Sequence, residues 1–217
     1  MPDYTSRRIM MVDTQVRPSD VTKFPIIDAM LNVPRELYVP QGQREAAYVG
    51  DNIPLGGDRV LLEPRTFAKL LDGLEIRPGD VILDVGCGLG YSTAVLARMA
   101  EFVVGLEDDP ERAQEAQATL SANGVDNAAV LEGPLAEGAE KNGPYDVIVI
   151  EGAVETLPEA FVAQLNDGGR IGCLFSEGTL GVARVGVKAD GRISWRSSFN
   201  AAAPVLTGFE RPEVFAL

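Results

Sequence analysis

Short apolar runs alternate with amphipathic segments through the middle of the chain. The runs are rich in Val, Ile and Leu and bounded by turn residues, a pattern typical of strands buried on both faces of a parallel sheet. They occupy residues 81–83, 102–106, 129–131 and 147–150. Helical spacing of apolar residues predicts a helix that starts at Pro64 and others over residues 91–99, 110–122 and 157–165. This alternation of strands and helices predicts parallel βαβ units.

The N-terminal part of the chain follows a helical pattern. Ser19-Asp20 is expected to cap a helix that ends at Asn32-Val33-Pro34, and a second short helix is expected to end by Pro40. Residues 51–64 are rich in Gly, Pro, Asn and Asp. That composition predicts a loop or a short hairpin.

The C-terminal part carries apolar runs without intervening helices. These runs lie at residues 170–175, 181–188 and 192–199. Strands that follow one another directly predict antiparallel pairing at one edge of the sheet. Since no linker divides the sequence, we expect one domain, with N-terminal helices and a loop over residues 1–63 and an α/β core over residues 64–217. The predicted fold class is therefore α/β, doubly wound and mostly parallel.

Charge and composition narrow the range of partners. The 217 residues carry a formal net charge of −13, with 19 Lys and Arg against 32 Asp and Glu. Nucleic-acid binding needs a basic face, so we expect neither a nucleic acid nor a membrane surface as a partner. No apolar run approaches the ~18 residues that span a bilayer, and no leader pattern opens the chain. We therefore expect a cytoplasmic protein.

Two residue types limit the chemistry. The sequence contains no histidine, which excludes Ser-His-Asp and Cys-His catalysis, an imidazole base and the usual zinc sites, so no metal is expected. Its two cysteines, Cys87 and Cys173, lie in a glycine-rich loop and in an apolar run. Two thiols do not make a disulfide scaffold. We expect both to be buried and free.

The most informative segment joins the first core strand to the following helix. Three glycines, Gly86, Gly88 and Gly90, stand at alternate positions between the strand and the helix that starts at Tyr91. Glycine lets a ligand approach the backbone closely, and ligands of doubly wound sheets bind beyond the carboxyl ends of the strands. The spacing differs from the G-x-G-x-x-G of dinucleotide-binding folds. The simpler alternative is a tight strand–helix turn.

Two acidic residues sharpen the prediction. Asp84 precedes the first glycine, where its carboxylate would repel a pyrophosphate but can hold a cation or, through water, an amino group. Glu107 ends the next strand, in register to accept hydrogen bonds from two ribose hydroxyls, although a glutamate there can also face solvent. Together they favour a zwitterionic amino-acid ligand joined to a nucleoside. A nicotinamide-dependent oxidoreductase is the least favoured alternative.

These motifs resemble a known family. The stretch from Asp84 to Gly90, with Glu107, resembles the first two cofactor motifs of class I S-adenosylmethionine-dependent methyltransferases. More narrowly, the chain resembles the protein-L-isoaspartate (D-aspartate) O-methyltransferase family over roughly residues 7–175. The similarity lies in residues 11–17, 33–40, 48–56, 90–97, 144–149, 158–160 and 165–170. The upstream segments 11–17, 33–40 and 48–56 are the specific ones, since many methyltransferases share the cofactor motifs.

The resemblance implies a fold, a cofactor and a reaction. The fold is a mostly parallel seven-stranded sheet with an N-terminal helical extension, and the cofactor is S-adenosyl-L-methionine. The reaction is methyl transfer to a carboxylate of a protein, a peptide or a small molecule. The implied cofactor-binding residues are Asp84, Gly86, Gly88, Gly90, Ser92, Glu107, Leu135 and Glu151.

The sequence departs from the family pattern in two places. Leu62 stands where the family has a serine or threonine implicated in catalysis, and Arg59 stands at a family glutamine. Gly133-Pro134 replaces a Gly-Asp pair whose acidic group meets the adenine amino group, although backbone at Leu135 can still contact adenine. These differences leave two alternatives open: a small-molecule O- or N-methyltransferase on the same fold, and a cofactor-binding protein without transferase activity.

Methyl transfer to a carboxylate suits a protein without histidine. A carboxylate has a reference pKa near ~4 and is ionised at pH 7, so the site needs no base; it must exclude water and align the reacting atoms. Asp51 and Arg59 are the candidate catalytic residues. Arg59 could pair with a substrate carboxylate or be a solvated loop charge, and Asp51 or Glu63 could act as a base for an amine or phenol. Asp51 could equally cap a turn, and Glu151 either faces the site or lies on the surface.

Overall fold

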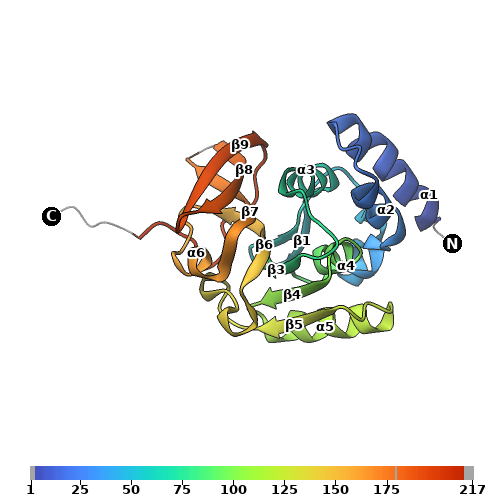
Figure 1. Ribbon diagram of the computed structural model, residues 1–217. Helices are drawn as coiled ribbons and strands as arrows, with labels where there is room; N and C mark the ends of the chain where they lie inside the picture. Colours follow the sequence, from blue (N-terminus) through green and yellow to red (C-terminus); the bar gives the residue numbers. More distant parts are fainter. Residues whose placement is uncertain (1–2, 179, 213–217) are drawn as a thin grey trace.

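A seven-stranded sheet forms the centre of the molecule (Figure 1). The computed structural model describes residues 3–178 and 180–212. The strand order is β5-β4-β3-β6-β7-β8-β9; the first five in that order are parallel, and β8 and β9 pair antiparallel. The strands are β3 (Val81–Val85), β4 (Phe102–Glu107), β5 (Ala128–Glu132), β6 (Tyr145–Val154), β7 (Leu165–Glu177), β8 (Leu180–Ala189) and β9 (Arg192–Asn200). The predicted fold class and its antiparallel edge are confirmed.

Six α-helices are found in the described ranges. They are α1 (Tyr4–Met11), α2 (Phe24–Asn32), α3 (Pro64–Leu74), α4 (Tyr91–Ala97), α5 (Pro110–Ala122) and α6 (Ala160–Gln164). Shorter helical turns are η1 (Val12–Val16), η2 (Arg17–Ser19), η3 (Arg35–Leu37), η4 (Gln41–Ala46), η5 (Leu135–Glu137) and η6 (Glu140–Asn142). Of the helices described, none combines the length and the apolar character needed to cross a membrane.

The core strands bury both faces, as their unbroken apolar runs predict. Ile82 packs on one face with residues of α3 and α4, whereas its neighbour Leu83 packs on the other face with Phe161 of α6. Successive strand residues point to opposite faces of the sheet. A strand whose two faces are both covered therefore needs apolar residues at every position. Cys87 and Cys173 are buried and free, as predicted.

The helix predicted from Ser19 begins later than expected. Asp20 has a left-handed backbone (φ 66°) and ends η2, and Lys23 is the N-cap of α2. The cap prediction at Ser19-Asp20 is therefore wrong, because Pro25 fixes the first turn of the helix and sets its start. The helix predicted over residues 157–165 is also shorter, since α6 starts only at Ala160.

The turn-rich segment after residue 51 forms a hairpin, one of the two structures predicted for it. Strands β1 (Ile53–Gly56) and β2 (Arg59–Leu61) pair antiparallel, with Ile53 opposite Leu61. Gly56 (φ 102°) and Gly57 (φ 57°) take the positive φ angles that its tight turn requires. We call residues 53–61 the hairpin.

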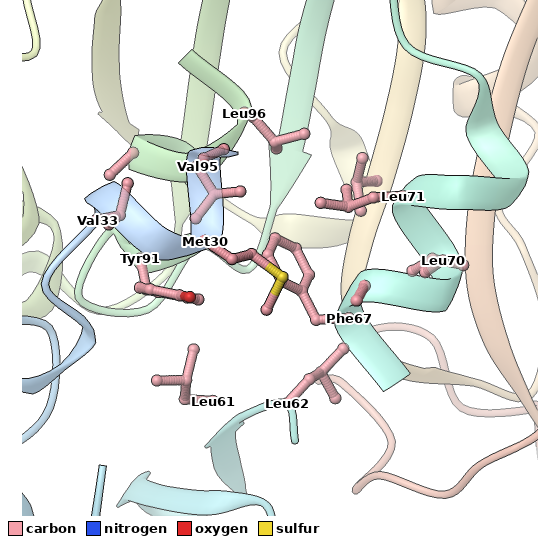
Figure 2. Packing of buried hydrophobic residues seen from close by; sticks show 14 of the residues in the cluster. Met30, Val33, Leu61, Leu62, Phe67, Leu70, Leu71, Tyr91, Val95 and Leu96 are labelled. Carbon is pink, nitrogen blue, oxygen red and sulfur yellow. The ribbon is translucent and has the colours of Figure 1, made fainter. Parts of the chain in front are cut away.

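One buried cation ties the N-terminal segment to the core. Arg35 is fully buried and donates from Nε to the Ala47 carbonyl (2.7 Å) and from Nη2 to the Leu62 carbonyl (2.8 Å). Its guanidinium lies 4.7 Å from the centre of the Tyr91 ring at the start of α4. Figure 2 shows Leu62 beside Phe67 in the adjoining apolar cluster. The division of the chain at residue 63 stays a prediction.

Candidate active site

Strand register brings the predicted acidic residues to one edge of the sheet. Val85 of β3 pairs with Leu106 of β4 on one side and with Ile150 of β6 on the other. The residues that follow on β4 and β6 are Glu107 and Glu151, so both lie beside the loop that leaves β3. The chain also runs outward from β3 to β5 and then returns to β6, which makes this the reversal point where doubly wound sheets bind ligands. We call it the carboxyl edge.

The glycine turn has a backbone that other residues rarely adopt. Gly86 (φ 78°), Gly88 (φ 58°) and Gly90 (φ 93°) all lie in the positive-φ region, and Gly90 caps α4. A Cβ atom on Gly86 would lie 2.7 Å from Arg59 Nη2, and one on Gly88 would lie 2.6 Å from Leu55 Cδ1. Side chains of the hairpin therefore fill the space that the missing side chains leave.

Asp84 is a buried carboxylate with one free oxygen. Its Oδ2 accepts hydrogen bonds from Ser92 Oγ (2.7 Å) and Thr93 Oγ1 (2.6 Å) at the start of α4. Its Oδ1 has no hydrogen-bond partner among the described residues. Burial raises the pKa of Asp84 to about 6, against the lowering effect of the two hydroxyls. A buried polar atom without a partner points to a bound group that completes it, and a carboxylate favours a cationic one.

Glu107 lies where predicted, but its oxygens are already engaged. Its Oε2 accepts from the Gly88 backbone N–H (2.8 Å) and from Arg59 Nη2 (3.1 Å). Its Oε1 accepts from Arg112 Nε (3.0 Å) in α5. Burial raises the pKa of Glu107, and the Arg59 charge opposes that shift. Glu107 is fully buried, so the alternative of a solvent-facing glutamate is wrong.

Glu151 faces the interior of the molecule and has one unpartnered oxygen among the described residues. It is buried, so the surface alternative is wrong, and its Oε1 lacks a partner within the described part of the chain. Burial, and then the Asp84 charge, raise the pKa of Glu151 well above its usual value. Arg35 Nη1 and the Tyr91 hydroxyl are also buried without partners there. The sequence analysis did not single out Arg35 as a site residue. The available signal was a charged pair, Arg35-Glu36, set between apolar residues.

The two candidate catalytic residues lie in different surroundings. Arg59 is buried and pairs with Glu107 (3.1 Å) and Asp108 (3.2 Å), so the solvated-charge alternative is wrong. Asp51 is exposed ahead of the hairpin. Glu63, the other acid of this loop, accepts from Thr66 Oγ1 (2.6 Å) at the start of α3. The structure thus brings Arg59, but not Asp51, to the glycine turn.

A third side of the site is covered by the C-terminal segment, residues 201–212. Leu206 donates its N–H to the Ala153 carbonyl (2.9 Å) near the C-terminal end of β6, and its Cδ2 lies 2.5 Å from where a Gly152 Cβ would be. Leu135 is buried at the start of η5, beside a groove of about 400 Å³ that Gly208 also lines. Sequence patterns gave no signal for Leu206, because its partners are distant in the chain.

Comparison with known proteins places the chain in a family. The family model described as Protein-L-isoaspartate(D-aspartate) O-methyltransferase (PCMT) matches residues 9–198. The protein-L-isoaspartate O-methyltransferase of Methylorubrum extorquens (strain PA1) is 36% identical over 171 residues, which is 79% of this chain and 75% of the relative. The enzyme of the same name from Ignicoccus hospitalis is 37% identical over 147 residues, 66% of this chain and 70% of the relative.

Solved structures share the fold. One named protein-L-isoaspartate O-methyltransferase matches with a TM-score of 0.80 at 21% identity, covering 94% of this chain and 66% of that one. A Plasmodium falciparum protein with the same enzyme designation, solved with S-adenosyl-L-homocysteine, matches with a TM-score of 0.77 at 20% identity, covering 95% and 99%. This chain therefore belongs to the protein-L-isoaspartate (D-aspartate) O-methyltransferase family and has the class I S-adenosylmethionine-dependent methyltransferase fold, as its sequence predicts.

Proposed function

We propose that the protein transfers the methyl group of S-adenosylmethionine to a carboxylate of a protein or peptide. The observation that carries this proposal is the carboxyl edge, where the free Asp84 oxygen, the glycine turn and Glu107 converge. Membership of an O-methyltransferase family supports the reaction class. A cytoplasmic location, and the residue roles that follow, are part of the proposal.

The residues of this edge fit the cofactor. Asp84 Oδ1, buried and unpartnered, suits the amino group of the methionine portion. Glu107 suits the two ribose hydroxyls once Arg59 leaves it, and the backbone at Gly86 and Gly88 allows close approach. The bound cofactor supplies a methyl group that its sulfonium already activates.

The remaining predicted cofactor residues act around this centre. Gly90 lets α4 start directly behind the turn, and Ser92 orients Asp84 through the 2.7 Å hydrogen bond. Leu135 offers buried apolar surface and a backbone N–H at the end of the sheet where adenine would lie. Glu151 lies on the opposite side, toward the methionine portion and the acceptor.

The electrostatics beside Glu151 suit an anionic acceptor. Its raised pKa favours the neutral acid, which can donate a hydrogen bond to an incoming carboxylate. Arg35, fully buried with Nη1 unpartnered among the described residues, adds a positive charge on this side. An acceptor carboxylate is ionised at neutral pH, so the site needs to orient it and exclude water rather than remove a proton.

A test of the proposal is the transfer of labelled methyl groups. We expect base-labile label in an isoaspartyl peptide and none in the matched aspartyl peptide. Label in small carboxylic acids alone would replace the protein acceptor with a small-molecule one. Bound cofactor with no label in any acceptor would contradict the enzyme and favour a binding protein, the alternative that Leu62 supports, since it is fully buried and offers no hydroxyl.

A further inference from the structure

We propose that Arg59 is a built-in competitor of the cofactor. Its guanidinium is bound to Glu107, the residue that the ribose hydroxyls need, so nucleoside binding must displace it and shift the neighbouring side chains of the hairpin. The inference rests on the proposed cofactor site. It adds a step that the glycine turn and the acidic residues do not predict by themselves.

The first support is the way Arg59 is held. Its Nη2 donates to Glu107 Oε2 (3.1 Å) and its Nη1 to Asp108 Oδ1 (3.2 Å), so one guanidinium spans two consecutive acids. Its side chain is 6% exposed. Nε, however, has no acceptor in the described part of the molecule. A buried donor without a partner weakens the closed arrangement, which makes an exchange of partners feasible.

The second support is steric. Arg59 Nη2 and Leu55 Cδ1 lie within 2.7 Å of the positions that Cβ atoms on Gly86 and Gly88 would take. A ligand that approaches the bare backbone of this turn needs the same space. The ends of these two flexible side chains must therefore move aside when the nucleoside binds at the turn.

The third support is the way in which the hairpin is held: Ile53, Leu55 and Leu61 pack into the main apolar cluster, so the hairpin stays attached when Arg59 moves. In the part of the chain that the structure describes, its two strands pair only with each other, as a two-stranded sheet apart from the central one. Its turn contains Gly56 and Gly57, which are exposed. When Arg59 leaves, Glu107 keeps the Gly88 N–H (2.8 Å) and Arg112 (3.0 Å) as partners. The carboxylate thus stays partly compensated until ribose hydroxyls replace the guanidinium.

Calorimetric titration with S-adenosylhomocysteine tests the inference. We expect Arg59→Ala to bind about tenfold more tightly than the wild type, a difference of about 1.4 kcal/mol. Arg59→Lys keeps the charge but cannot span two carboxylates, and should gain about threefold. Arg65→Ala is the matched control, because it removes the same charge from a half-exposed site nearby and should leave the affinity unchanged.

Hydrogen exchange provides a readout that does not depend on affinity. Without nucleoside, amides of residues 53–61 should exchange faster in Arg59→Ala than in the wild type or in Arg65→Ala. Adding S-adenosylhomocysteine to the wild type should also change their exchange. If Arg59→Ala folds poorly, two measurements still test the inference: the affinity of Arg59→Lys for S-adenosylhomocysteine, and the change in hairpin exchange when the wild type binds it.

The outcomes separate the inference from the proposed function. If the wild type binds and Arg59→Ala binds equally or more weakly, Arg59 is no competitor and the cofactor site stands. Unchanged exchange of the hairpin on binding has the same meaning. If none of the variants binds the nucleoside, the proposed function fails together with the inference.

Discussion

The carboxyl edge and the hairpin place charges in the same small volume by different means. At the edge, Asp84 is held by Ser92 and Thr93, eight and nine residues along the chain, and one of its oxygens has no partner in residues 3–178 and 180–212. In the hairpin, Arg59 is held by Glu107, 48 residues away. The edge is shaped by backbone register and positive-φ glycines, whereas the position of the hairpin depends on tertiary contacts. A binding site and the group that obstructs it are thus encoded in separate parts of one chain.

The largest effect is expected from removing the buried Arg35 side chain, which binds backbone carbonyls before and after the hairpin. Arg35→Ala should lower the free energy of unfolding by about 4 kcal/mol, since it leaves the Ala47 and Leu62 carbonyls without their buried donor and opens a cavity under Tyr91. Urea denaturation measures it. Arg65→Ala, at a half-exposed site, should cost less than about 0.5 kcal/mol. Equal costs for the two variants would contradict the role of Arg35 as an anchor.

The pH dependence of the free energy of unfolding tests the burial of Asp84 at the carboxyl edge. Burial raises the Asp84 pKa to about 6 from the reference 3.8, so the folded state binds the proton more tightly than the unfolded state. The stabilisation that the protonated Asp84 gives the folded state is fully present below about pH 4. It is lost as pH rises through 6, which lowers the free energy of unfolding by up to about 3 kcal/mol. The difference in unfolding free energy between wild type and Asp84→Asn should follow that course. A difference that is flat over this pH range would show that Asp84 is not strained by burial.

Cofactor binding should depend on the edge more than on overall charge. Asp84→Ala removes the unpartnered oxygen and should weaken S-adenosylhomocysteine binding about 100-fold, or about 2.7 kcal/mol. Asp126→Asn, an exposed acid, should change the affinity less than twofold. Calorimetry measures both. An Asp84→Ala protein that binds like the wild type would place the nucleoside elsewhere.

The smallest effect is expected at the thiol of the glycine turn. Cys87 is buried, and its Sγ lies 3.1 Å from where a Gly105 Cβ would be. Cys87→Ser should cost about 1 kcal/mol of stability by burying a hydroxyl, and should leave nucleoside affinity within about threefold. Thermal denaturation and calorimetry measure the two. A tenfold loss of affinity would mean that the thiol contacts the ligand.

The edge could be predicted from sequence because its determinants are local. The apolar run that ends at Asp84, the alternate glycines and the helix 110–122, which matches α5 in both bounds, lie within short stretches. Glu107 follows from the same logic, since parallel strands end at one edge. The resemblance to class I methyltransferases needed only those stretches, whereas the narrower family resemblance also needed the N-terminal segments 11–17, 33–40 and 48–56.

The side chains that cover the site, those of Arg59 and Leu206, could not be predicted from the sequence, because their contacts join distant segments. Arg59 reaches Glu107, and Leu206 packs onto Gly152, through folding of the whole chain. The start of α2 depended on competition between a Ser-Asp cap and Pro25, which propensity alone did not settle. Burial of Arg35 likewise depends on carbonyls of two loops.

A crystal structure with S-adenosylhomocysteine tests the central claim most directly. We predict both ribose hydroxyls within hydrogen-bond distance of Glu107, the amino group at Asp84 Oδ1, and the Arg59 guanidinium displaced from its 3.1 Å contact with Glu107. A nucleoside bound away from the glycine turn would contradict the account. So would one bound at the turn with the Arg59–Glu107 pair still intact.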